Sequence, residues 1–252
     1  MSKRVFRPSV NARSILLSLF VAVATVLACV PVASAKVVEL GAGSDEAATS
    51  KCPGDPCLAL YKVTGYQGRS SNLKNPFAIP SAGYITSFTI DLPQLSQEQI
   101  DFFEENLGGS AQVRLSLLRV GTTRKTRLNH RLVKQSEIFG VSSYFGSSPT
   151  FVLKEPMRVG KGTILALTVP TWLPALASDT SGANWWRSSR PKDKCGDDDS
   201  LSPPSAMEEI GEIVRFGCTY KKARLLFTAT YVPDNVPTTV EQDTEKDTGK
   251  AK

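Results

Sequence analysis

Apolar and polar residues alternate with a period of two in four segments between residues 83 and 232, which is typical of strands with one buried face. The inward positions are predicted to be Tyr84, Thr86, Phe88 and Ile90; Val113, Leu115 and Leu117, with Arg114 and Ser116 facing out; Leu165, Leu167 and Val169; and Ala223, Leu225, Phe227, Ala229 and Tyr231. Weaker strand patterns cover residues 58–64, 127–135, 150–154 and 213–220. Glycine and proline turns separate these segments. The predicted fold is therefore all-β, a two-sheet antiparallel sandwich, with a jelly roll as one topology that would fit.

One short helix is predicted after residue 96. Ser96 and Gln99 form a capping box, in which each side chain bonds the backbone amide of the other residue. Ile100, Phe103 and Leu107 then recur on one face, and Gly108 ends the helix because glycine adopts the left-handed conformation without steric cost. We expect this helix to cover one end or edge of the sandwich.

Residues 1–35 have the order of a secretory signal peptide. A basic start without acids is followed by an apolar stretch from Ile15 to Val32 and by the small-residue cleavage sequence Ala33-Ser34-Ala35. The protein is therefore predicted to be secreted. Two alternatives stay open: an uncleaved signal anchor, since the apolar stretch is long, and lipidation at Cys29, which follows Val26-Leu27-Ala28.

The rest of the chain is predicted to have three parts. Residues 36–51 are mostly small and polar and are interpreted as a linker or a loosely tied arm. Residues 52–232 form the β-sandwich domain. Residues 233–252 carry charged residues and almost nothing apolar, so they are predicted to be a disordered tail.

Four cysteines remain after the signal, and they allow three disulfide pairings. We expect Cys52–Cys57 and Cys195–Cys218, because each pair closes a local loop. In the chain-entropy treatment, the longer loop would contribute on the order of 3 kcal/mol to stability. A four-cysteine zinc site is the alternative, but the short ligand spacing of such sites is absent.

Charge argues against two classes of partner. The signal segment carries four of the 30 Lys and Arg and none of the 24 acids, so the remaining chain has a formal charge of +2. A near-neutral domain gives no support for a nucleic-acid or anionic-membrane partner. No apolar run after the signal is long enough to be a transmembrane segment.

No catalytic or cofactor motif stands out. The chain has no Gly-x-Ser-x-Gly elbow and no phosphate-binding glycine loop, and its single histidine, His130, is interpreted as a surface or edge residue. Two groups of carboxylates are interpreted as solvated: Asp101, Glu104 and Glu105 on the helix, and Glu208, Glu209 and Glu212. Asp197-Asp198-Asp199 lacks the alternate spacing of a calcium loop, although calcium binding there stays an alternative. We predict no catalytic residue, no metal and no cofactor.

The candidate ligand-binding residues are Trp185, Trp186 and Arg187, which with Trp172 include every tryptophan of the chain. An exposed Trp beside Arg can stack on a sugar ring or anchor a protein partner. The alternative, and the commoner use of such aromatic side chains, is that one or both tryptophans fill the core near the Cys195–Cys218 loop.

Several short motifs together resemble a family of predicted secreted β-sandwich proteins from actinobacteria. They lie between residues 52 and 232 and include Cys52-Pro-Gly-Asp-Pro-Cys57, Gly65-Tyr66-Gln67, Asn75-Pro76-Phe77, Phe102-Phe103, Ala111 to Arg119, Ala166 to Trp172, Trp186 to Arg190, Gly217 to Tyr220 and Ala223 to Thr230. The resemblance implies a secreted sandwich with all four of these cysteines in disulfides. No activity is established for that family, so it supplies no catalytic residue.

Three function classes follow. The favoured one is a non-catalytic binding or cell-envelope-associated module, with a polysaccharide as a candidate ligand. The second is a structural or protein-interaction domain of the cell surface, which predicts a broad exposed apolar patch. The third is a carboxylate-based hydrolase, which needs two facing carboxyl groups.

Overall fold

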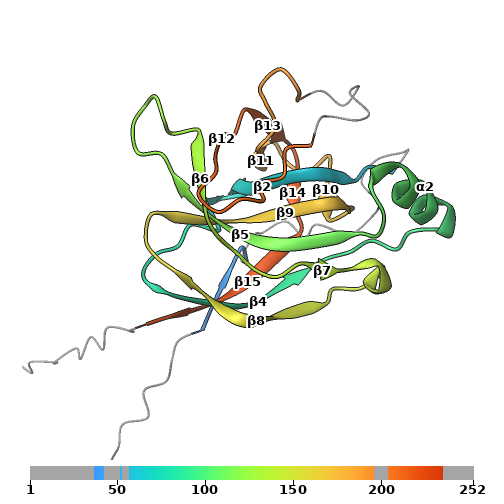
Figure 1. Ribbon diagram of the computed structural model, residues 1–252, viewed down its shortest axis with the longest axis horizontal. Helices are drawn as coiled ribbons and strands as arrows, with labels where there is room; N and C mark the ends of the chain where they lie inside the picture. The colour runs from blue at the N-terminus through green and yellow to red at the C-terminus, as the bar shows by residue number, and fades with distance from the viewer. Residues whose placement is uncertain (1–36, 43–51, 53–56, 196–203, 235–252) are drawn as a thin grey trace, which may run out of the picture. The chain divides into compact units, whose positions relative to one another are not determined.

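The computed structural model describes residues 37–42, 52, 57–195 and 204–234, which belong to the unit Ala35–Lys252 (Figure 1). The predicted signal peptide, Asp197-Asp198-Asp199 and all of the predicted tail beyond Asp234 lie outside these residues.

The described residues form many short strands, one α-helix and one short 3-10 helix. In chain order they are β1 (Val38–Leu40), β2 (Leu60–Ser70), β3 (Leu73–Lys74), β4 (Gly83–Ile90), α2 (Gln97–Leu107), β5 (Gln112–Val120), β6 (Asn129–Gln135), β7 (Phe139–Gly140), η1 (Ser142–Tyr144), β8 (Thr150–Val159), β9 (Thr163–Leu173), β10 (Leu176–Ala177), β11 (Trp185–Ser188), β12 (Ile213–Arg215), β13 (Cys218–Lys221), β14 (Arg224–Leu225) and β15 (Phe227–Pro233).

These strands build two main antiparallel sheets. The smaller has the order β1-β15-β4-β8, and the larger has nine strands, with β12-β6-β5-β9-β2-β11-β13 as its main path. Strands β10 and β14 form a separate pair. Figure 1 shows β15, β4 and β8 on one side of β5, β9 and β2, and the apolar core contains residues from both groups, such as Phe88 and Leu115. The predicted all-β sandwich with one short helix is confirmed.

The larger sheet is curled, which the alternation pattern did not predict. Its two end strands, β12 and β13, are joined by only Phe216 and Gly217, so the Cα atoms of Arg215 and Cys218 can be at most about 11 Å apart. In a flat sheet the six strand spacings of that path would span about 29 Å. The path must therefore bend back towards its own start.

Contacts across the concave side of this sheet confirm the curl. Tyr66 on β2 and His130 on β6 are three strand positions apart, yet their ring centroids are 5.1 Å apart. Phe216, at the junction of β12 and β13, lies against both, with centroid distances of 5.6 Å to Tyr66 and 4.3 Å to His130. Gly217 is required at this junction, because a Cβ there would lie 2.5 Å from the backbone nitrogen of Lys192.

Most predicted inward positions are buried, but one strand departs from the pattern. In β4, Phe88 and Ile90 are buried as predicted, whereas Tyr84 is 40% exposed and Ile85 is fully buried in its place. A register shift between Ile85 and Ser87, in the pairing of β4 with β8, changes which side chains face the core. The prediction for Tyr84 and Thr86 was therefore wrong.

The second face of β5 also differs from its prediction. Ser116 was expected to face out, but it is fully buried because residues 205–207 cross the concave face above it. A chain of side-chain hydrogen bonds fills this space: Gln135 Nε2 donates to Ser116 Oγ (2.9 Å), Ser116 Oγ and Thr168 Oγ1 are 2.6 Å apart, and Thr168 Oγ1 and Thr64 Oγ1 are 2.8 Å apart. The amide of Met207 donates to Thr64 Oγ1 (2.9 Å), which attaches the covering segment to the sheet.

Thr168→Val is expected to lower the free energy of unfolding by about 2 kcal/mol, because Ser116 and Thr64 each lose a buried hydrogen-bond partner. Urea denaturation followed by circular dichroism measures the change. Thr219→Val, on an exposed strand position, is the matched control and should change stability by less than about 0.5 kcal/mol. An equal effect of the two substitutions would contradict a role for the buried hydroxyl chain.

Helix α2 begins and ends as predicted. Ser96 Oγ accepts from the Gln99 amide (3.3 Å), Gln99 Oε1 accepts from the Ser96 amide (2.9 Å), and Gly108 has a φ of 96°. Phe103 is buried against Trp172 of β9, with ring centroids 4.8 Å apart, and the Trp172 indole N–H donates to the carbonyl of Gly109 (2.6 Å). The helix thus packs on the end of β9.

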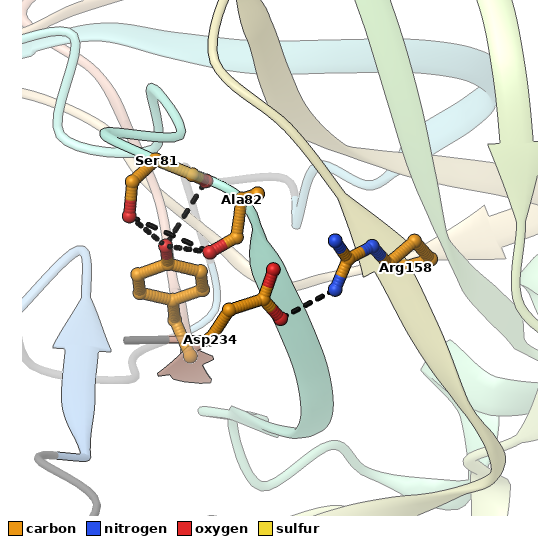
Figure 2. Close-up of polar contacts among 5 residues, drawn as sticks. Ser81, Ala82, Arg158 and Asp234 are labelled. Atoms are coloured by element: carbon orange, nitrogen blue, oxygen red, sulfur yellow. Dashed lines mark hydrogen bonds and ion pairs between the residues drawn. The ribbon is translucent and has the colours of Figure 1, made fainter. Parts of the chain in front are cut away.

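The chain segments that enter and leave the domain both belong to the smaller sheet. Val38–Leu40 pairs with β15, so the predicted linker was wrong for these three residues, which form the edge strand β1. At the other end, Asp234 forms an ion pair with Arg158 of β8 (Figure 2). The hydroxyl of the buried Tyr231 is hydrogen-bonded to Ser81 and Ala82, which are both labelled in Figure 2.

Both expected disulfides are present. Cys52 pairs with Cys57, and Cys195 pairs with Cys218. The second bridge fixes Cys218, the first residue of β13. This is the place where Phe216 and Gly217 join the two end strands of the curled sheet, β12 and β13. Disulfides form and persist in oxidising compartments. The two bridges therefore indicate that the protein works in an oxidising, extracellular environment.

Candidate functional site

The three predicted ligand-binding residues, Trp185, Trp186 and Arg187, are the first three residues of β11. This strand lies between β2 and β13 in the larger sheet. Trp186 pairs with Gln67 and Tyr220, and Arg187 pairs with Tyr66 and Thr219. Because successive side chains of a strand point to opposite faces, the two tryptophans have different environments.

Trp186 is a packing residue. It is 2% exposed, and its ring stacks on Tyr220 with a centroid distance of 4.4 Å and an interplanar angle of 17°. Gly65 lies beneath it, where a Cβ would be 2.8 Å from the indole ring. A ligand cannot stack on a ring covered in this way, so the structure places Trp186 in the core, as the alternative interpretation of the sequence had it.

Trp185 is half-buried and lies where β11 comes close to β2. A Cβ on Gly68 would be 1.8 Å from the indole, so only glycine allows the ring to rest on β2 at this point. The pairing of β2 with β11 changes register between Trp185 and Trp186, so that Trp185 faces Arg69. A bulge of this kind redirects a side chain, and here it sets the indole against the sheet.

Arg187 accompanies this indole. Its Cζ lies 5.6 Å from the centroid of the Trp185 ring, which is within the range of a cation–π contact. One of its N–H groups donates to the carbonyl of Phe216 (3.4 Å), a long hydrogen bond that leaves its other donors for further partners. Trp185 and Arg187 therefore remain together as the candidate site.

Cross-strand pairing adds residues that the sequence did not reveal. Lys74 on β3 pairs with Arg69 on β2, Arg69 pairs with Trp185, and Trp185 pairs with Lys221 on β13. We call these four residues the Trp185 row. Arg69 and Lys74 are close in the sequence, but Trp185 and Lys221 are far from them and from each other, so only knowledge of the strand register would have brought all four together.

The charge of this region is positive. Strands β2, β3, β11 and β13 contain no Asp or Glu, and Lys74 and Lys221 are exposed while Arg69 and Arg187 are half-buried. Within the described part of the chain, Arg158–Asp234 is the only ion pair, so these four cations have no carboxylate partner there. The near-neutral charge of the chain without its signal segment thus does not reveal this local group of cations.

His130 was expected at the surface or an edge, and this was wrong. The residue is fully buried on the concave side of the curled sheet, because Phe216 and Tyr66 pack over its ring. Its Nδ1 donates to the carbonyl of Leu128 (3.0 Å). Burial, with a smaller contribution from the nearby Arg187 charge and against the opposing effect of the Leu128 hydrogen bond, lowers the pKa of the imidazole to about 4. Burial raises the pKa of Tyr66, and Arg187 partly opposes that shift.

The predicted solvated carboxylates lie at or near the surface. Asp101, Glu105, Glu208 and Glu209 are exposed, and Glu104 and Glu212 are half-buried. Among the residues that the structure describes, no group of three or more His, Cys, Asp and Glu side chains is placed to hold a metal ion. In the same residues, no helix is long and apolar enough to cross a membrane.

No protein-family model, no curated protein and no solved structure matches this chain.

Proposed function

We propose that this protein is a secreted, non-catalytic binding module of the cell envelope, and that it binds polysaccharide through Trp185 and Arg187. The observation that carries the proposal is the Trp185 indole, held on the sheet by Gly68 with the Arg187 guanidinium beside it. A fixed amphipathic ring contacts the apolar face of a sugar at little cost in conformational entropy, and the guanidinium offers several donors to its oxygens.

Other features support secretion and binding. Two disulfides suit an extracellular compartment, and the signal-like segment 1–35 precedes the domain. The competing role, a structural or protein-interaction domain, predicts a broad exposed apolar patch. The large apolar side chains that are exposed lie on many different elements, including Tyr84 on β4, Phe102 on α2, Tyr144 on η1, Val152 on β8 and Ile213 on β12.

The test is a fluorescence titration of the secreted chain, produced in an oxidising host, with a panel of cell-wall and plant polysaccharides. We expect a saturable change in tryptophan emission with at least one polymer. Trp185→Ala should weaken binding by about tenfold or more, since a central aromatic contact contributes about 1.4 kcal/mol or more. Phe102→Ala, which removes an exposed aromatic ring on α2, is the matched control and should bind as wild type does.

Absence of binding to every polymer would overturn the proposal and favour a protein partner. Binding that Trp185→Ala and Arg187→Gln leave unchanged would place the ligand elsewhere on the domain.

A further inference from the structure

We propose that the polysaccharide bound at Trp185 is acidic, and that Lys74, Arg69, Arg187 and Lys221 contact its anionic groups. This inference rests on the proposed function and adds the chemical class of the ligand. Its basis is the combination of one half-buried indole with four cations on adjacent strands.

The geometry suits an extended chain molecule. The Trp185 row crosses four neighbouring strands in the order β3-β2-β11-β13, so its three strand spacings cover about 14 Å. The indole lies within the row, with Arg69 on one side and Lys221 on the other, and Arg187 lies two residues further along β11. A polymer lying along the row would contact a cation on either side of the ring.

Three cations of the Trp185 row and the neighbouring Arg187 together favour a partner of opposite sign. Four cations on adjacent strands repel one another, and no described carboxylate forms an ion pair with any of them. Anionic groups on a ligand would relieve this repulsion. The two arginines suit carboxylate, sulfate or phosphate groups, because a guanidinium can donate two parallel hydrogen bonds to such a group.

A glycan fits these observations better than a nucleic acid does. Proteins that bind nucleic acids generally carry a large positive charge over a whole face, whereas the chain without its signal segment has a formal charge of only +2. Single-stranded nucleic acids are bound by several aromatic rings that stack successive bases, and the Trp185 row has one such ring. Four cations beside one indole match a sugar polymer with an acidic group at intervals.

The experiment compares polymers that differ only in charge. Binding of the secreted chain is measured for polygalacturonate and its methyl ester, and for dextran sulfate and dextran. We expect at least one acidic polymer to bind about tenfold or more tightly than its neutral match, and its affinity to fall as salt is raised. Polyglutamate, a polyanion without sugar, should bind more weakly than that acidic polysaccharide.

Two variants locate the contact. The double substitution Lys74→Gln with Lys221→Gln removes the two exposed cations of the row and should weaken binding of the acidic polymer by about tenfold. Lys161→Gln, on an exposed turn outside these strands, is the matched control and should have no effect. Circular dichroism checks that each variant is folded.

The possible failures are distinguishable. Equal affinity for the acidic and neutral members of both pairs, with binding lost in Trp185→Ala, would overturn the acidic ligand and leave the proposed function standing. Binding of polyglutamate as tightly as the acidic polysaccharide would reduce the site to a general polyanion surface. If no polysaccharide binds, both proposals fail.

Discussion

Trp186→Ala is expected to lower the free energy of unfolding by about 4 kcal/mol, the usual cost of removing a buried tryptophan. The indole is 2% exposed and fills the space between Tyr220 and the backbone at Gly65. Truncation would leave a cavity that these neighbours, held in paired strands, cannot close. Urea denaturation monitored by circular dichroism measures the loss.

Two further variants make this expectation specific. Trp186→Phe keeps an aromatic ring against Tyr220 and should lose clearly less stability than Trp186→Ala. Trp185→Ala removes a half-buried ring and should lower the free energy of unfolding by only about 1 kcal/mol. It should nevertheless weaken ligand binding more than the Trp186 variants do. If Trp186→Ala unfolded at the same urea concentration as wild type but lost its ligand, the assignments of the two tryptophans would have to be exchanged.

Local sequence signals predicted the parts of the fold that depend on neighbouring residues. The helix was found because Ser96 and Gln99 are three positions apart, as the capping box requires. The strand β15 was found because its alternation is regular from Phe227 to Tyr231, and the disulfides because each closes a short loop. In each case the interacting residues are close in sequence or follow one simple period.

The features that were missed depend on pairing between distant strands. The curl brings Tyr66 and His130 together across the sheet, and no local pattern around His130 distinguishes this burial from an exposed position. Likewise, Lys74 and Lys221 lie beside the Trp185 position only through the register of β3, β2, β11 and β13. The composition near Trp185 suggested a site, but its charge could not be obtained without that register.

The stability of the protein is expected to fall as the pH is lowered from about 6.5 to about 4, because His130 titrates differently in the folded and unfolded states. In the folded state its pKa is about 4, below the ordinary value of 6.5 that the unfolded chain retains. Above pH 6.5 the imidazole is neutral in both states, and the full stability is present. Between the two values only the unfolded state gains the proton, so stability decreases, by about 3 kcal/mol in total.

The cause of this shift lies in the surroundings of the ring. The neutral imidazole donates from Nδ1 to Leu128, while Nε2 has no hydrogen-bond partner among the described residues. A proton on Nε2 would place a charge against the Tyr66 and Phe216 rings, away from water and near the Arg187 cation. The folded state therefore resists protonation until the pH is well below the ordinary pKa of histidine.

Urea denaturation of the wild type and His130→Phe at intervals from pH 7.5 to 4.5 tests this expectation. Phenylalanine preserves the packing against Phe216 and removes the titrating group, which is the only histidine in the chain. Because both proteins share all carboxylates, the difference between their unfolding free energies isolates the histidine. That difference should change with pH below 6.5, in the direction that favours the variant in acid. A constant difference across the range would show that His130 has an ordinary pKa, and hence that the concave side of the curled sheet is open to water at this ring.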